Sequence, residues 1–400
     1  MAGFRPRRNP GIPDEPGDCW AAIVRAADPL AGIGRGEAGT PPRVPRDAAG
    51  GISVDRSLGR VSRGPALAGV VTLTFVLLTG CSGDQARPTA TASATAASAR
   101  GCLPAGDPAA SVHGGFGIGQ TQVTFVDHSR PTGAAPDRNL AGKPDRTIPV
   151  VVSYPIIPAA DAAPAAPAIA GAASAPGRFP LVVLSHGVTS DGTVAANVIA
   201  APLVRQGYVV ATPTFPLSSG PGGTIFDLPN QPADVSFVIT SLSAWSTTAG
   251  TPLAGHLQAS CLAIAGHSLG AATTLAAAYL SCCRDPRVKA VVSMAGVIAA
   301  FKGTFAGNPP TPLLILHGDQ DQTVPLDKSA EMFRTLRGPR YFLTLRGAGH
   351  STMFFEQAGQ TLDQSVTAFL DAYLKGDFSA LHALPGDVRR SGVATYQAAS

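Results

Sequence analysis

Charged residues are scarce in this sequence of 400 residues: Asp, Glu, Lys and Arg together make up 14%, and aromatic residues only 6%. The net charge of +4 is modest, and much of the arginine surplus lies near the start of the chain, at Arg5, Arg7, Arg8, Arg43 and Arg46. Because no basic face or nucleic-acid-binding motif accompanies these arginines, we expect no nucleic acid as a partner. The spacing of the cysteines and histidines is not that of a zinc site, so we expect no bound metal.

Long apolar runs are also missing, with one exception at residues 66–79 (ALAGVVTLTFVLLT). This run follows several arginines, is too short to span a bilayer comfortably, and ends in Leu-Thr-Gly-Cys81, features that together predict a secretory signal. The ending resembles a bacterial lipobox, in which Cys81 is lipidated and becomes the mature N-terminus. We therefore expect an exported lipoprotein that faces outward from the cell membrane through an N-terminal lipid anchor. A plain signal peptide or signal anchor, with Cys81 incidental, is the alternative.

The composition divides the chain into three parts. Residues 1–81 form a leader that ends in the signal and lipobox, and most of the first 110 residues have the composition of disordered segments. Because a signal normally lies at the true N-terminus, we expect residues 1–53 to precede the real start, at Val54 or Val61. Residues 82–112 are rich in small polar residues and predict a flexible linker. Residues 113–400 remain as one domain, long enough to bury a large core.

Four cysteines remain in the exported part: Cys102, Cys261, Cys282 and Cys283. An even number in an oxidising compartment predicts two disulfides. We expect a helix after residue 268 to bring residues 282–283 back to the start of the strand that holds Cys261. This placement favours a bond from Cys261 to one of the pair, with Cys102 bound to the other. Free buried thiols are the alternative.

The rest of the chain alternates between two patterns. Segments 122–127 and 148–154 are rich in β-branched residues and predict an antiparallel pair at a sheet edge. The low-complexity segment 158–177 predicts a surface excursion. Short apolar runs then recur at 181–185, 208–212, 262–266, 290–294, 313–317 and 341–345. Helical patterns lie between most of them, at 195–206 (bent at Pro202), 233–242, 271–281, 327–336 and 362–373. Such alternation predicts an α/β fold with a mostly parallel central sheet and helices on both faces.

The sequence Gly266-His267-Ser268-Leu269-Gly270 joins one of these strands to the helix that follows it. Strand, sharp turn and helix with a serine at the apex are typical of a nucleophile elbow, in which glycines leave room for a tight turn. An ordinary glycine-rich loop is the alternative for so common a motif. The flanking strand and helix favour the elbow, with Ser268 as the nucleophile.

A serine hydroxyl needs a base and an orienting carboxylate to become a nucleophile. In hydrolases with such an elbow, the acid and then the histidine follow the serine along the chain. His350 lies in the loop after the strand at 341–345, and Asp319 and Asp321 both follow the strand at 313–317. We expect Asp321 to be the acid and Asp319 either to cap the turn or to hydrogen-bond the backbone. The only other histidine after Asp321 is His382, which we place in a tail beyond the last helix.

Two backbone N–H groups are expected to form an oxyanion hole. One belongs to Leu269, directly after the nucleophile, and the other to Val188, in the loop after the strand at 181–185. His186 and His267 are expected to orient these loops rather than to take part in catalysis. Segment 213–228, with Phe215 and Phe226, predicts either a short acyl-binding lid or a loop that covers the core.

The region 117–369 resembles the α/β-hydrolase superfamily, most closely the branch of platelet-activating-factor acetylhydrolases and dienelactone-hydrolase-like proteins. The matching pieces are FGIGQTQVTFVDHSRPT, PVVVSYP, FPLVVLSHG, QPADVSFVI, AGHSLGAATT, LILHGDQDQTVP and GAGH. The resemblance implies an α/β-hydrolase fold, a triad of Ser268, Asp321 and His350, an oxyanion hole at Val188 and Leu269, and ester hydrolysis with no cofactor. True dienelactone hydrolases have cysteine at the elbow, so their substrate is not implied. Asp234 matches the family pattern and is interpreted as structural.

These features together predict an exported serine hydrolase of the carboxylesterase or lipase type. No large cap insertion is visible, so a small-molecule, lipid or polymeric ester could reach the site. An acyltransferase with the same triad is the first alternative, since an alcohol would simply replace water. A hydrolase-fold binding protein without catalytic activity is the second, and the complete triad argues against it. The sequence identifies no protein partner.

Overall fold

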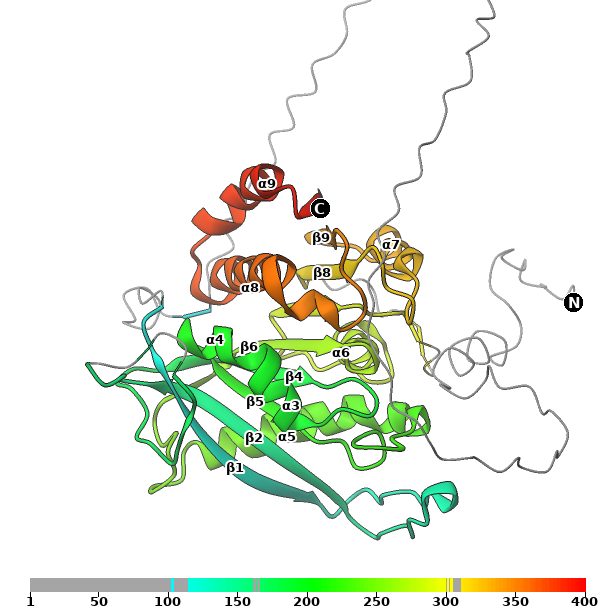
Figure 1. Ribbon diagram of the computed structural model, residues 1–400. Helices are drawn as coiled ribbons and strands as arrows, with labels where there is room; N and C mark the ends of the chain where they lie inside the picture. Colours follow the sequence, from blue (N-terminus) through cyan, green and yellow to red (C-terminus); the bar gives the residue numbers. More distant parts are fainter. Residues whose placement is uncertain are drawn as a thin grey trace, which may run out of the picture. The chain divides into compact units, whose positions relative to one another are not determined.

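A ten-stranded mixed sheet runs through the residues that this computed structural model describes, which are 102–103, 114–160, 163, 166–299, 301, 303–304 and 311–400 (Figure 1). The strand order is β10-β9-β8-β7-β6-β4-β5-β2-β1-β3. All of these residues belong to one compact unit. The predicted leader 1–81, with its apolar run and Cys81, lies outside the described residues, as does the linker 82–112 apart from residues 102–103.

Parallel strands form the centre of the sheet. They are β4 (Phe179–Ser185), β5 (Val209–Pro213), β6 (Leu257–His267), β7 (Ala290–Met294), β8 (Leu313–Gly318) and β9 (Arg340–Leu345). Each pairs in parallel with its neighbours in this group. Strands covered on both faces need apolar residues at successive positions, which explains why their sequences lack polar alternation. The predicted α/β fold with a mostly parallel sheet is therefore confirmed.

Antiparallel pairs lie on both sides of the parallel strands. Strand β1 (Gly117–Asp127) pairs with β2 (Arg146–Ile156) along its whole length, as predicted for an edge pair. Two exposed residues of the low-complexity excursion, β3 (Ile169–Ala170), add to the outer side of β1. At the opposite edge, β10 (Ala394–Ala399) pairs antiparallel with β9.

Helices cover both faces of the sheet, and alternate strand residues point to opposite sides. Leu181 and Val183 of β4 pack with α5 (Gln231–Trp245), α6 (Leu269–Tyr279) and α7 (Leu326–Thr335). Val182 and Leu184 pack on the other face. That face holds α3 (Gly192–Ala195), η2 (Ala196–Ala200), α4 (Ala201–Arg205), α8 (Glu356–Leu370), η5 (Asp371–Lys375) and α9 (Ser379–Ser391). In the described part of the chain, no helix combines the length and the apolarity needed to cross a membrane.

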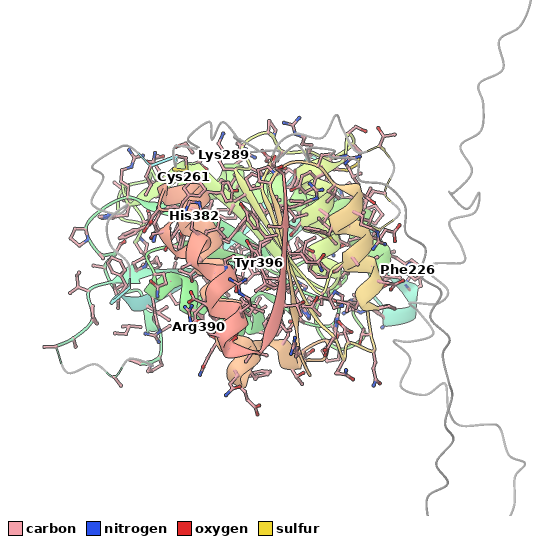
Figure 2. All side chains as sticks on the ribbon, turned by 90° about the horizontal axis from the view of Figure 1, so that it is seen from above. Phe226, Cys261, Lys289, His382, Arg390 and Tyr396 are labelled. Carbon is pink, nitrogen blue, oxygen red and sulfur yellow. A yellow bond between two sulfur atoms is a disulfide. The ribbon has the colours of Figure 1, made fainter. Side chains whose placement is uncertain are left out.

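The helix predicted at 195–206 is irregular near Pro202, as expected, whereas the C-terminal segment differs from its prediction. The helix at 195–206 loses regular α geometry at the π-helical turn η2, just before Pro202, whose nitrogen cannot donate to a preceding carbonyl. The expected C-terminal tail is instead α9 followed by β10, and His382 lies on the exposed side of α9 (Figure 2). The buried face of α9 consists of Leu381, Leu384 and Val388. Pro385 and Gly386 are poor helix formers, so the sequence around these apolar residues does not look helical.

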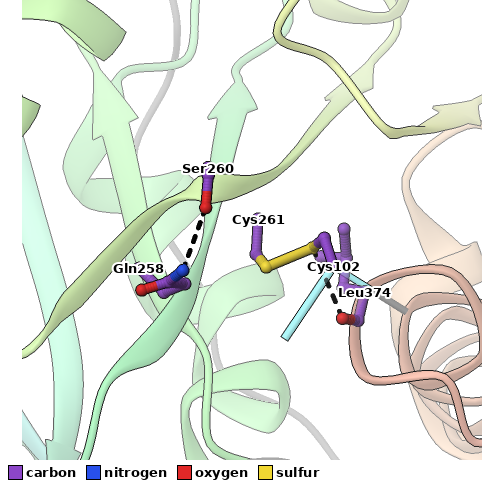
Figure 3. Close-up of a disulfide and its surroundings, with 5 residues drawn as sticks. All are labelled: Cys102, Gln258, Ser260, Cys261 and Leu374. Atoms are coloured by element: carbon purple, nitrogen blue, oxygen red, sulfur yellow. Dashed lines mark hydrogen bonds between the residues drawn. A yellow bond between two sulfur atoms is a disulfide. The ribbon is translucent and has the colours of Figure 1, made fainter. Parts of the chain in front are cut away.

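The predicted disulfide pairing is wrong. The structure joins Cys102 to Cys261 (Figure 3) and Cys282 to Cys283. Strand β6 begins at Leu257, earlier than predicted, so Cys261 lies within the strand and is fully buried. Cys282 instead occupies an exposed turn after α6.

The Cys102–Cys261 disulfide fastens the N-terminal segment to the body of the domain. The N–H groups of Cys102 and Leu103 both donate to the carbonyl oxygen of Leu374, at 3.0 and 3.2 Å. Leu103 also packs in the buried core. Residues 102–103 are therefore covalently fixed to β6.

A buried ion network holds α5 against β2. Arg146 has no exposed side-chain surface and donates from Nε and Nη2 to the two carboxylate oxygens of Asp234, at 2.6 Å each. The same Nη2 donates to Asp227, and Arg130 adds a second cation 2.9 Å from Asp234. Loss of one member would leave a buried charge unpaired, which is strongly destabilising. The arrangement agrees with the structural interpretation of Asp234.

Candidate active site

Ser268 stands between β6 and α6 in a strained backbone conformation. Its φ of +55° and ψ of −121° are unusual for a residue with a side chain. A Cβ at Gly266 would lie 2.2 Å from the carbonyl oxygen of Gly270, and one at Gly270 would lie 2.1 Å from that of Ser185. Only glycine fits at either position. The turn thus has the tight geometry that presents a serine hydroxyl at the end of a strand.

The loop after β4 packs directly beside this turn. A Cβ at Gly187 would lie 3.2 Å from the Cβ of Ser268, so the loop backbone approaches the serine closely. His186 holds the loop: its Nε2 accepts the N–H of Phe215, which leaves Nδ1 to donate to Gly187 O at 2.7 Å. Burial lowers the pKa of His186, so the imidazole is neutral. His186 orients the loop, as expected from the sequence.

Val188 and Leu269, the expected oxyanion-hole residues, lie together. Their side chains belong to one apolar cluster with Leu228. Leu269 is the first residue of α6, and the first N–H groups of a helix have no partner within it. The next two N–H groups of the loop already have partners: Thr189 donates to Ser218 O, and Ser190 donates to Gly187 O. This leaves the Val188 N–H as the loop's candidate donor.

Asp321 and His350 form a close pair. His350 Nδ1 lies 2.7 Å from Asp321 Oδ2; the aspartate side chain is fully buried and the histidine side chain is 15% exposed. Burial alone would raise the pKa of Asp321, but hydrogen bonds from His317 and His350 hold it well below its usual value. The carboxylate is therefore ionised. Asp319 instead accepts the N–H of Gly347 at 2.7 Å, in the loop that leads to His350.

His267 supports the loop of His350 from the elbow. Its Nε2 donates to the backbone carbonyl of His350 at 3.0 Å, and the two imidazole rings lie 4.7 Å apart. Burial, together with the neighbouring His350, lowers the pKa of His267 to about 3. A neutral imidazole is thus available as a donor to the carbonyl throughout the physiological range.

Ser268 Oγ makes no hydrogen bond to His350 within the described residues, and such contacts often tighten only when substrate binds.

A cavity of about 570 Å³ opens onto Ser268 and His350. Its lining residues are His186, Gly187, Val188, Thr189, Ser190, Val194, Ala195, Val198, Ile199, His267, Ser268, Thr323, His350, Ser351, Phe354 and Phe355. The α3–η2 segment forms an apolar wall, and the aromatic wall comes from η4 (Thr352–Phe354) and the residue that follows it. The exposed Val194 (49%) and Phe355 (55%) make the mouth apolar as well. This aromatic pair was not predicted from the sequence, because it is recognisable only from its position four and five residues after His350.

The topology of the sheet explains why these residues meet. Strand β4 is flanked by β5 on one side and β6 on the other, so the chain reverses its direction of winding between β4 and β6. Loops at the carboxyl ends of strands diverge at such a switch point and leave a crevice. Ser268 follows β6, the Gly187 loop follows β4, and Asp321 and His350 follow β8 and β9.

The segment 213–228 contributes in two ways. Phe215 is completely buried in the core, and its ring lies 5.1 Å from that of His186. In η3 (Ile225–Asn230), Ile225 packs against the cluster of Val188 and Leu269, whereas Phe226 is 82% exposed (Figure 2). The segment therefore covers core at one end and presents an aromatic side chain to solvent at the other.

Among the described residues, no three His, Cys, Asp or Glu side chains are grouped so as to hold a metal ion.

Comparisons with known proteins agree with this architecture. The family model described as PET hydrolase-like matches residues 169–387, more than half of the chain. A solved structure, a ferulic acid esterase from Streptomyces cinnamoneus, superposes with a TM-score of 0.52 over 66% of this chain and 92% of the esterase, at 23% identity. That likeness shows a shared fold. A search of curated proteins gave no match.

Proposed function

The chain belongs to the PET hydrolase-like family of α/β hydrolases, and from this premise we propose that it is an exported serine hydrolase of carboxylic esters. One observation carries the proposal: His350, which is hydrogen-bonded to the buried Asp321, lines the same cavity as the strained Ser268. Nucleophile, base and orienting acid are thereby within one site. The closer resemblance to platelet-activating-factor acetylhydrolases stays a prediction.

In the proposed reaction, Ser268 Oγ attacks the carbonyl carbon of the ester while His350 Nε2 takes the hydroxyl proton. Asp321 accepts the hydrogen bond from Nδ1 and stabilises the imidazolium. The N–H groups of Val188 and Leu269 bind the oxyanion of the tetrahedral intermediate. His350 then returns its proton to the leaving alcohol, and an acyl-enzyme remains. Water, activated by the same imidazole, releases the acid.

The shape of the cavity supports an ester with an apolar part. Val194, Val198 and Ile199 line one wall and Phe354 and Phe355 the other, so burial of alkyl or aryl groups is favoured. The mouth is open, with exposed apolar side chains at its rim. Both small esters and the ends of polymeric or lipid esters are compatible with this form.

Hydrolysis of p-nitrophenyl esters of increasing acyl length tests the proposal. We expect kcat/KM to rise as the pH passes through about 6–7, where an imidazole loses its proton and becomes a base. Two neighbouring groups do not change charge in this pH range. Asp321 is already ionised, and His267, with a pKa of about 3, is already neutral.

Two other results would contradict the proposal. An absence of turnover with every ester of the series would favour the non-catalytic binding protein. Dominant transfer of the acyl group to a low concentration of added alcohol, with little free acid formed, would favour the acyltransferase.

We also propose that Cys81 carries the lipid that anchors the protein outside the cell, on the strength of the Leu-Thr-Gly-Cys81 sequence alone. Cys81→Ala should release the protein from membranes or block its maturation, because the lipid attaches to this thiol. Fractionation and the mass of the mature protein measure the effect. Unchanged membrane association together with an unshifted mass would rule lipidation out.

A further inference from the structure

A second imidazole contacts the carboxylate of Asp321. His317, near the end of β8, has no exposed side-chain surface, and its Nε2 lies 3.1 Å from Asp321 Oδ2. His350 Nδ1 contacts the same oxygen at 2.7 Å. One carboxylate oxygen thus lies between two imidazoles, and the proposed reaction uses only one of them.

The hydrogen bonds of Asp321 are complete. Its Oδ1 accepts the N–H groups of Thr323 and Val324, at 2.8 and 2.9 Å, its Oδ2 accepts from His350 Nδ1, and His317 Nε2 lies 3.1 Å from the same Oδ2. A carboxylate offers about four acceptor positions, so these four donors fill them. Its own turn fixes Oδ1, and His317 fixes Oδ2 from the side of the core.

The hydrogen bonds of His317 determine which of its nitrogens is the donor. Nε2 lies 2.9 Å from Val324 O, and a carbonyl can only accept, so Nε2 carries a proton. That proton is shared between Val324 O and Asp321 Oδ2. Nδ1 is held at 2.7 Å by the hydroxyl of Ser329 on α7, which also lies 3.3 Å from Gly296 O. The ring is thus fixed between β8, α7 and the loop after β7.

We propose that His317 is a positioning residue for the Asp321–His350 pair, and this inference rests on the proposed function. By donating from Nε2 to Oδ2, it holds the carboxylate in the orientation that meets His350 Nδ1. The aspartate then needs no rearrangement when His350 becomes positively charged, which is the advantage of a preorganised site. Without His317, the carboxylate can rotate away from His350, and catalysis falls while substrate binding does not.

Three substitutions at His317 separate this role from a purely structural one. Gln places an amide N–H near the position of Nε2 and keeps the donor to Asp321. Asn reaches only as far as Nδ1, and Leu fills the space without a polar atom. The matched control is His382→Gln, because His382 is exposed on α9 (Figure 2) and does not line the cavity.

We expect His317→Asn and His317→Leu to lower kcat about 10- to 100-fold, the range typical of a hydrogen bond to a charged group, with KM within about twofold. His317→Gln should recover kcat to within about threefold of the wild type, and His382→Gln should equal it. The assay uses the whole purified protein with p-nitrophenyl acetate. Titration with a phosphonate counts the active sites, so that kcat is calculated per folded enzyme molecule. Circular dichroism gives the midpoint of thermal unfolding.

A fall in the thermal midpoint with kcat per active site unchanged in the Asn and Leu variants would overturn the inference. Equal losses in the Gln and Leu variants would also overturn it, since the donor would then be irrelevant. Both results leave the proposed function standing, because the wild type is active in them. A wild type without esterase activity, or activity that survives Ser268→Ala, would overturn the proposed function and this inference with it.

Discussion

Ser268→Ala should lower the turnover of an activated ester by about 10⁴ to 10⁶, with the protein still folded. The reason is that the hydroxyl forms the acyl-enzyme, and neither His350 nor the oxyanion hole can replace that bond. The three residues act as a unit, so His350→Ala should cost nearly as much, and the double variant little more. Initial rates with p-nitrophenyl acetate, at enzyme concentrations high enough to detect the residual activity, measure the loss.

Ser260→Ala is the matched control for this substitution. Ser260 lies on the same strand, β6 (Figure 3), but it is exposed and lies near the start of the strand, whereas Ser268 follows its end. It should retain the turnover of the wild type. Substantial ester hydrolysis by Ser268→Ala would show that another residue is the nucleophile.

Asp321→Asn should lower turnover by roughly 10⁴, somewhat less than loss of the nucleophile. The amide is neutral and can direct its NH₂ group at His350 Nδ1. That contact would favour the imidazole tautomer that cannot accept the proton of Ser268. Substrate binding should change little, because the carboxylate is buried behind His350.

Asp319→Asn is the control for the choice between the two aspartates. Asp319 accepts only the N–H of Gly347 among its described contacts, and an asparagine carbonyl oxygen can accept the same bond. Its turnover should stay within a few-fold of the wild type. A larger loss at Asp319 than at Asp321 would reverse the assignment of the acid.

Much of this site could be anticipated because its parts have local signatures. The apolar runs predicted strands β4 to β9, since a strand covered on both faces must be apolar throughout. The glycines around Ser268 predicted the tight turn, and the structure shows that a Cβ at either position would collide with backbone. The order of Ser268, Asp321 and His350 along the chain, at the ends of β6, β8 and β9, then indicated that their side chains converge.

Other features depend on contacts between distant residues and have no local signature. The fixing of Oδ2 by His317 requires knowledge of how β8, α7 and the turn of Asp321 pack together. The pairing of Cys102 with Cys261 depends on where the N-terminal segment docks, which the sequence does not encode as a pattern. The burial of Arg146 against Asp234 joins positions 88 residues apart.

Helix α9 was missed for a different reason. Its apolar positions have helical spacing, but Pro385 and Gly386 lower the intrinsic helix propensity in its middle. Packing of Leu381, Leu384 and Val388 against the core outweighs that preference. Tertiary contacts of this kind become visible only once the neighbouring helix, α8, is in place.

Covalent labelling with a serine-directed phosphonate tests the central claim most directly. The phosphonate mimics the tetrahedral intermediate and reacts only with a serine that is activated by a base and placed beside an oxyanion hole. Peptide mass spectrometry of the labelled, inactivated protein should find one adduct, on Ser268, and no adduct in the His350→Ala variant. An adduct on a different residue that accounts for the loss of activity, or full inactivation with Ser268 unmodified, would contradict the proposed mechanism.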